Sequence, residues 1–329
     1  MKVTENKIDN LNLELTLAVA AEDYAEIEKK KLSERRRTAE FKGFRKGMVP
    51  ASLIKRVYGE QALVESVNQV IGTALDKHIT DNNLRILGEP LPSEKQPENV
   101  WEDGNDFTFV FDLGLTPVVS VDVEKSDTVP TYTVTVTAKD KAPMIENLKK
   151  YYEEKKEEKT DEELDKEVTD RLHAQYKNEA EWRLTKDIRN YFIKKADVQL
   201  PEAFLKRWLI QANEGKVTAE DVEKDFPAFA EDFKWQLVRG TLMQKWGFQV
   251  EDKDLQEQAE AFARYQYAMY GIGNVPDEMV KEMAVNMLHD QKQVERLYEQ
   301  VEDRKVLDKI KETITLKPTK IGTAKFREL

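Results

Sequence analysis

The chain lacks cysteine, has only three histidines, and contains no apolar run near the length of a membrane span. Without cysteine it can hold no disulfide, no thiolate nucleophile and no cysteine-based metal site. His78, His173 and His289 lie far apart in the sequence, and none belongs to the H-E-x-x-H pattern of zinc proteases. A helix that crosses a bilayer needs about 20 mainly apolar residues, so we expect no membrane partner.

Motifs that bind nucleotides or activate a serine are also missing. Gly271 and Gly273 are followed by neither the third glycine of a dinucleotide fingerprint nor the Gly-Lys-Ser/Thr of a P-loop, and there is no G-x-S-x-G element. We therefore predict no catalytic residue, no metal and no cofactor, and we interpret the histidines as surface or structural residues. The first residues carry no apolar signal-peptide core, which indicates a cytoplasmic location.

What the chain has in abundance is charge, which accounts for 35% of its 329 residues and gives a net charge of -11. The length suits about two domains. The acidic balance argues against nucleic acid as a partner for the whole surface. Residues 153–167 are almost all charged, and we interpret them as a solvated helix face or a joint, with a functional acidic patch as the alternative.

The first third of the chain predicts a small α+β unit, residues 1–118. Apolar and polar residues alternate at 8–20 and again around Phe109, which indicates strands. Apolar residues at helical spacing indicate helices from about 23 to 39 and from 50 to 82. The proline-rich stretch 84–100 is expected to be loop.

Two further regions complete the predicted α+β fold class. Residues 119–142 are β-rich and predict an extended arm that links two domains, whereas residues 143–329 predict a mainly α-helical domain with helical arms. Three helix starts are expected there: a capping box at Thr160, Pro201 at the start of a helix, and a cap at Thr218. Two further helices are expected at 255–270 and 276–311.

Positive charge is concentrated in one short segment of this acidic chain. Residues 29–56 hold eleven lysines and arginines against two glutamates, a net charge of +9. A concentrated basic patch favours a polyanionic partner. The alternative is a basic helix pair without any partner.

At the centre of the basic segment, Gly43 and Gly47 enclose Phe44, Arg45 and Lys46. Glycine permits backbone angles that other residues avoid, which predicts a tight loop. Phe44 has no partner face in a helix or strand, so we expect it at an exposed tip. There it could enter an apolar pocket while the cations meet acidic groups or phosphates. The alternative is that Phe44 folds back onto the helices.

The segment GFRKGMVP at 43–50, followed by LI at 53–54 and RVYG at 56–59, resembles the ribosome-binding signature of trigger factor, the bacterial nascent-chain chaperone. VQLPEAF at 198–204 resembles that family's entry into a C-terminal helix, and the order of elements in 1–118 also fits the family. The resemblance implies an ATP-independent chaperone that docks on protein and RNA at the ribosomal exit tunnel, shelters nascent polypeptides, and assists folding and export. It also implies a homodimer off the ribosome. The ribosome-binding residues that it implies are Gly43, Phe44, Arg45, Lys46, Gly47 and Pro50.

Two departures from the family limit this expectation. The family usually has lysine or histidine where this chain has Met48, so one cationic contact is missing. Trigger factors usually carry a prolyl-isomerase domain of the FKBP type after the extended arm. No glycine- and aromatic-rich β pattern is visible between 139 and 160, so we expect that domain to be absent and the chain not to be an enzyme.

A chaperone needs an adaptable apolar surface, and flexible methionine side chains suit varied partners. The candidate client contacts are Tyr267, Met269, Tyr270, Met279, Met283 and Met287. The last three are four residues apart, so the alternative is a core stripe of one helix. Two other functions stay open: a peptidyl-prolyl isomerase of the same family, and an acidic helical adaptor for a single protein partner.

Overall fold

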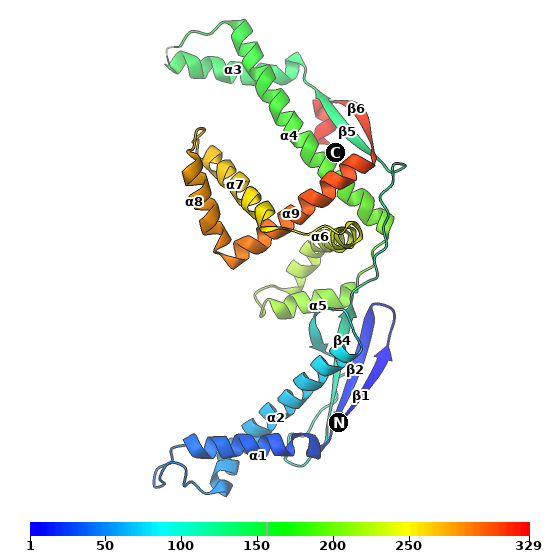
Figure 1. Cartoon of the computed structure of the whole chain (residues 1–329), viewed down its shortest axis with the longest axis vertical. Coiled ribbons are helices and arrows are strands. Elements are labelled where there is room, and N and C mark those ends of the chain that lie inside the picture. The colour runs from blue at the N-terminus through cyan, green and yellow to red at the C-terminus, as the bar shows by residue number, and fades with distance from the viewer. Residues whose placement is uncertain (156) are drawn as a thin grey trace. The chain divides into compact units, whose positions relative to one another are not determined.

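The computed structural model describes residues 1–155 and 157–329. The chain divides into two compact units, and Figure 1 labels elements of both. Unit 1 comprises Met1–Val118 and Gln199–Ala230, and unit 2 comprises Val119–Val198 and Glu231–Leu329. The α+β class expected from the sequence is confirmed.

Unit 1 contains an antiparallel four-stranded sheet with the order β1-β2-β4-β3. Its strands are β1 (Lys2–Lys7), β2 (Asn12–Val19), β3 (Ile86–Pro92) and β4 (Phe107–Leu115). The alternating leucines of β2, among them Leu13, Leu15 and Leu17, are buried as the sequence predicts. The prediction of a loop at 84–100 is wrong for the first part of that stretch, because β3 forms there. Its prolines are tolerated since β3 is an edge strand with an irregular register.

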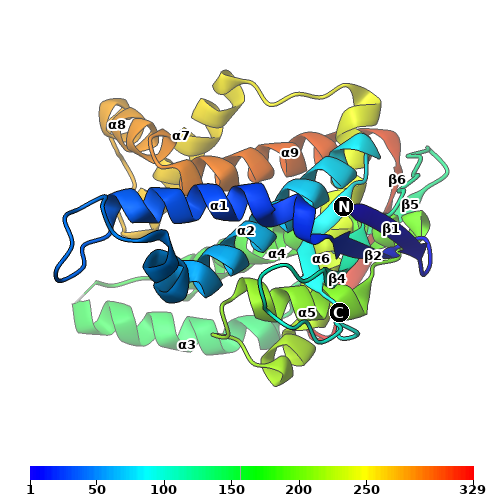
Figure 2. The ribbon, with the colours of Figure 1, turned by 90° about the horizontal axis from the view of Figure 1, so that it is seen from below.

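Helices α1 (Ala21–Thr38) and α2 (Ala51–Asp81) lie side by side in both views (Figures 1 and 2). The α2 helix buries Leu63, Val67 and Ile71 in the same core as Tyr24 of α1 and the leucines of β2. The helix bounds expected from the sequence differ from these by only one or two residues at each end.

A third helix of unit 1, α5 (Glu202–Ala212), packs on strands β3 and β4. Gly88 and Gly114 make this approach possible, since a Cβ at either position would overlap the ring of Trp208 or Phe204. The sequence placed these helical residues in the 143–329 domain. The contact that brings residues 199–230 into unit 1 joins segments at least about 90 residues apart in the sequence. No local sequence pattern can predict such a contact.

In unit 2, a helical hairpin packs on a small parallel sheet. The hairpin is α3 (Ala138–Lys155) and α4 (Asp161–Ala196), and the sheet pairs β5 (Thr128–Thr135) with β6 (Thr315–Gly322), which leads into α10 (Thr323–Arg327). The expected capping box is confirmed, because the Thr160 hydroxyl accepts a hydrogen bond from the Glu163 N–H and the Glu163 carboxylate accepts one from the Thr160 N–H.

The rest of the helical region consists of α6 (Ala219–Trp246), α7 (Asp252–Met269), α8 (Asp277–Leu288) and α9 (Gln291–Thr313). Three expectations are corrected. Helix α3 begins at Ala138, inside the expected 119–142 arm. Strand β6 lies in the region expected to be helical, where its distant partner β5 decides its conformation. The helix expected at 276–311 is two helices, because Asp290 caps α9 by accepting the Gln293 N–H at 3.1 Å.

Candidate functional site

The loop between α1 and α2 in unit 1 is made of two tight turns. The Phe44 N–H donates to the Phe41 carbonyl at 3.0 Å, and the Met48 N–H donates to the Arg45 carbonyl at 2.9 Å. Gly43 and Gly47 have φ angles of +92° and +82°, which non-glycine residues rarely adopt. Phe44 is 44% exposed and Met48 is 68% exposed. The predicted exposure of Phe44 is therefore confirmed.

The base of this loop is fixed by a small core that sequence reasoning missed. Val49 and Ile54 are buried against Ala39, with Phe41 and Tyr58 packed around them. The Arg36 side chain donates through Nε to the Val49 carbonyl at 2.7 Å. The apolar residues that flank the glycine-enclosed tip were the available signal. This small core holds the base of the loop, while Phe44 at the tip of the loop stays exposed.

The positive charge around the loop is largely unneutralised. Arg45, Lys42 and Arg56 have no carboxylate partner in the part of the chain that the structure describes. Lys46 approaches Glu40 only at 3.6 Å between exposed side chains, a kind of pair that contributes little. The basic tip can therefore contact a polyanion without first breaking a strong ion pair.

A carboxyl cluster lies beside the cavity between α1 and α2. Burial raises the pKa of the Glu28 carboxyl, and the neighbouring Asp103 carboxylate adds to that rise. Lys55 pairs with Asp103 and lowers the pKa of Asp103. These groups border a cavity of about 550 Å³ between α1 and α2. The cluster joins α1, α2 and the loop before β4, and so holds the helix pair that presents the tip.

Unit 2 carries an exposed apolar patch where α7 meets α8. The two helices lie side by side, and Arg264 pairs with Asp277 at 2.6 Å near the connection (Figure 1). Met269 and Tyr270 are 69% and 82% exposed, and Met279 is 47% exposed. We call Met269, Tyr270 and Met279 the tip patch. Such exposed large apolar side chains are a feature of interaction surfaces.

The other predicted client residues lie deeper. Met287 is only 6% exposed and packs with Ala259, Ala284 and Leu297, and Met283 is half-buried against the same cluster. Tyr267 is half-buried. The methionines that are four residues apart on α8 therefore become more buried from Met279 to Met287. Met287 belongs to the helix core, because the side of α8 that carries it faces α7 and α9.

The groups that an enzyme would need do not gather in the described parts of unit 1 or unit 2. No set of three His, Asp or Glu side chains there could hold a metal ion. Nε2 of His78 lies 2.6 Å from the Glu5 carboxylate, His173 lies in α4, and His289 follows the end of α8. No helix among the described residues is long and apolar enough to span a membrane. The features that stand out among the described residues are a basic aromatic loop on unit 1 and an exposed apolar helix tip on unit 2.

The comparisons with known proteins agree on one family. A family model described as "Bacterial trigger factor protein (TF)" matches residues 1–148, and "Probable trigger factor, C-terminal domain" matches residues 180–329. The chain belongs to the trigger factor family.

Individual relatives align over part of the chain. The trigger factor of Francisella tularensis subsp. novicida (strain U112) is 30% identical over 169 residues, which are 51% of this chain and 37% of that protein. The trigger factor of Methylocella silvestris (strain DSM 15510 / CIP 108128 / LMG 27833 / NCIMB 13906 / BL2) is 34% identical over 125 residues, which are 37% of this chain and 27% of that protein. The chain thus covers well under half the length of these relatives.

This chain is also similar to a solved structure described as "Promiscuous Substrate Recognition in Folding and Assembly Activities of the Trigger Factor Chaperone". The TM-score is 0.56 at 15% sequence identity, and the match covers 95% of this chain and 99% of that chain. At this identity the likeness shows the fold alone.

Proposed function

We propose that this protein is an ATP-independent cytoplasmic chaperone that docks at the ribosomal exit tunnel through the Gly43–Gly47 loop and shelters nascent polypeptides. The observation that carries the proposal is the exposure of Phe44 between two glycines with positive φ, next to the unneutralised cation of Arg45. In this proposal, residues 1–118 are the ribosome-binding domain, 119–142 the linker, whose last residues begin α3, and 143–329 the client-binding domain, of which 199–230 pack into unit 1.

The chemistry of the tip suits a ribonucleoprotein surface. Phe44 can enter an apolar pocket on a protein, and Arg45 can make paired hydrogen bonds to carboxylate or phosphate groups. The net charge of +9 on residues 29–56 provides attraction to RNA phosphates over a longer range. Pro50, the residue before α2, and Gly47 hold the loop geometry and do not need to touch the partner.

Replacing Phe44, Arg45 and Lys46 by alanine tests the docking loop. We expect the variant to lose most of its co-sedimentation with ribosomes at unchanged thermal stability, because all three side chains are exposed. The matched control is Trp182→Ala with Lys166→Ala and Lys186→Ala, which removes an exposed aromatic ring and two cations from α4. Ribosome binding that survives the loop substitutions unchanged would rule out this loop as the docking element.

We further propose that the chain has no prolyl-isomerase activity. Between the linker and α5, residues 138–155 and 161–196 form a helical hairpin, and neither family model matches 149–179. An isomerisation assay on a short peptide with an X-Pro bond checks this. Rates above those of the uncatalysed peptide would contradict the proposal and favour an isomerase.

A further inference from the structure

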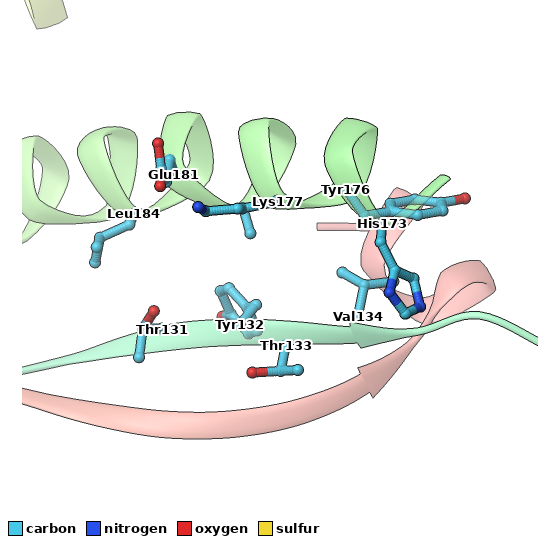
Figure 3. A pocket seen from close by; sticks show the side chains of 10 residues that line it. Thr131, Tyr132, Thr133, Val134, His173, Tyr176, Lys177, Glu181 and Leu184 are labelled. Carbon is cyan, nitrogen blue, oxygen red and sulfur yellow. The ribbon is translucent and has the colours of Figure 1, made fainter. Parts of the chain in front are cut away.

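A groove in unit 2 runs between helix α4 and strand β5 (Figure 3). It encloses about 410 Å³ and is lined by residues 131–134 of β5 and by α4 residues between His173 and Leu184. Figure 3 shows side chains from both elements along the groove, with β5 lying between α4 and β6. None of the client residues predicted from the sequence lies in it.

The groove follows the edge of β5 and not one face of the sheet. Successive side chains of a strand point to opposite faces, yet four consecutive residues, 131–134, all line the groove. The lining includes no residue of β6, and β6 is the strand that pairs with β5 in the described sheet. The groove therefore opens on the edge of β5 that faces away from β6.

The strand register shows which backbone groups face the groove. The Asp127 carbonyl accepts the Thr315 N–H at 2.8 Å, so odd-numbered residues of β5 direct their N–H and C=O groups toward β6. Neighbouring residues of a strand direct these groups to opposite sides, so Tyr132 and Val134 direct theirs toward the groove. Pro130 fits this register, because an even-numbered residue loses no ladder donor by lacking an N–H.

Those backbone groups have no other partner in the described parts of the chain. Outside the β5–β6 ladder, the N–H groups of Tyr132 and Val134 make no backbone hydrogen bond there. An open strand edge of this kind is a template for a further strand. Proteins that bind extended peptides use such edges, with main-chain hydrogen bonds giving affinity that depends little on sequence.

The α4 wall adds charge of both signs. Lys177 and Glu181 are four residues apart, a spacing that permits an ion pair, but neither pairs with an opposite charge in the described chain. Leu184 and Val134 add apolar surface. The walls can therefore meet acidic, basic and apolar side chains of one bound segment.

We infer that this groove binds an extended segment of unfolded polypeptide as an additional strand on β5. The inference rests on the chaperone function proposed above and names the chemistry by which clients are held: the client's own backbone. Every unfolded chain carries those donors and acceptors, so the site is compatible with many clients.

The test compares Val134→Pro with Val134→Ala. Both remove the valine side chain, but only proline removes the N–H that faces the groove, and neither changes a donor to β6. The probe is a fluorescein-labelled ten-residue peptide in which valine alternates with threonine, lysine and glutamate. We expect Val134→Pro to weaken peptide binding about tenfold and Val134→Ala by at most about threefold, since one net hydrogen bond corresponds to such factors.

Hydrogen exchange provides a readout that does not depend on any variant. On adding the peptide to the wild-type protein, the amides of Tyr132 and Val134 should exchange more slowly. The amides of Thr131 and Thr133, already bonded to β6, should change little. This alternation is specific to an added strand and is not expected if the peptide only packs on side chains.

The outcomes separate the inference from the proposed function. Equal affinities of the two variants, or no protection of Tyr132 and Val134, would overturn the groove site, and continued suppression of aggregation would leave the chaperone function intact. If the wild-type protein bound neither the peptide nor reduced, carboxymethylated lactalbumin, both would fail. Protection of the same amides that rises with protein concentration alone would replace the client with a second copy of this chain.

Discussion

At the scale of single residues, two ionisable groups with little solvent exposure, Glu28 and Asp303, each link several elements of this protein. Glu28 of α1 is 5% exposed, and Asp303 joins α9 to two other helices. Neither lies in an arrangement with a nucleophile or a metal site among the described residues. Substitutions of both should change the free energy of unfolding, and for Glu28, whose pKa burial raises, that change should depend on pH.

Glu28→Gln should stabilise the protein at neutral pH. Unfolded Glu28 ionises near a pKa of about 4.3, whereas burial raises its pKa in the folded state. The folded state therefore keeps a proton that the unfolded chain has lost, and stability present below the unfolded pKa is lost as pH rises through the folded pKa. Glutamine keeps a donor for Asp103 and has no charge to desolvate.

The measurement is the free energy of unfolding in urea from pH 4 to 8. The gain of Glu28→Gln over wild type should grow with pH and reach about 1 kcal/mol. Glu26→Gln, an exposed position on the same helix, is the control and should show little gain. A gain that does not change with pH would mean that the Glu28 charge is not the cause.

Asp303→Asn should destabilise unit 2 strongly. The Asp303 carboxylate accepts the Trp235 Nε1–H at 2.7 Å and pairs with Arg189 and Arg239, whose side chain is 10% exposed. Removing the charge leaves Arg189 without its carboxylate partner and Arg239 with Glu302 alone, at a cost of about 2 kcal/mol. Urea denaturation checks this, with the exposed Asp308→Asn as control. Equal stabilities of the two variants would show that the Asp303 cluster contributes nothing.

At the scale of elements, helices α7 and α8 show how one apolar pattern serves two purposes. Met283 and Met287 face the cluster around Ala259, while the tip patch faces solvent. The sequence could not separate these roles, because methionines four residues apart share a helix face whether that face is covered or not. The packing of α7 and α9 decides which of them are covered.

Replacing Met269, Tyr270 and Met279 by serine tests the tip patch. Because these side chains are exposed, the thermal midpoint should shift by less than about 2 °C. Suppression of the aggregation of unfolded proteins should fall severalfold, since the patch loses its apolar area. The control replaces Val285, 50% exposed on α8 away from this tip, by serine. An unaltered aggregation assay would exclude the patch as a client surface.

At the scale of the whole molecule, charge is distributed unevenly. The chain has a net charge of -11, yet its residues 29–56 alone carry +9. The proposed docking on the ribosome should therefore weaken as salt rises, because a protein cation that binds an RNA phosphate releases a bound counterion. Between 50 and 200 mM salt we expect a loss of about tenfold or more.

Sedimentation at several salt concentrations measures the slope. Lys42→Ala, beside the exposed tip, should lower that slope by about one. Lys166→Ala, an exposed position on α4, should leave it unchanged. An affinity that does not depend on salt would indicate docking through the aromatic contact alone.

The sequence alone determined what depends on neighbouring residues along the chain. The two glycines specified the exposed Phe44 loop, Thr160 and Glu163 specified the start of α4, and the alternating leucines specified β2, because backbone angles, caps and strand faces are local properties. Only the tertiary structure decided what joins distant segments. It showed that α5 packs over Gly88 and Gly114, and that β6 pairs with β5 almost 190 residues earlier. That pairing leaves the other edge of β5 open, because a two-stranded sheet satisfies the backbone groups on only one side of each strand.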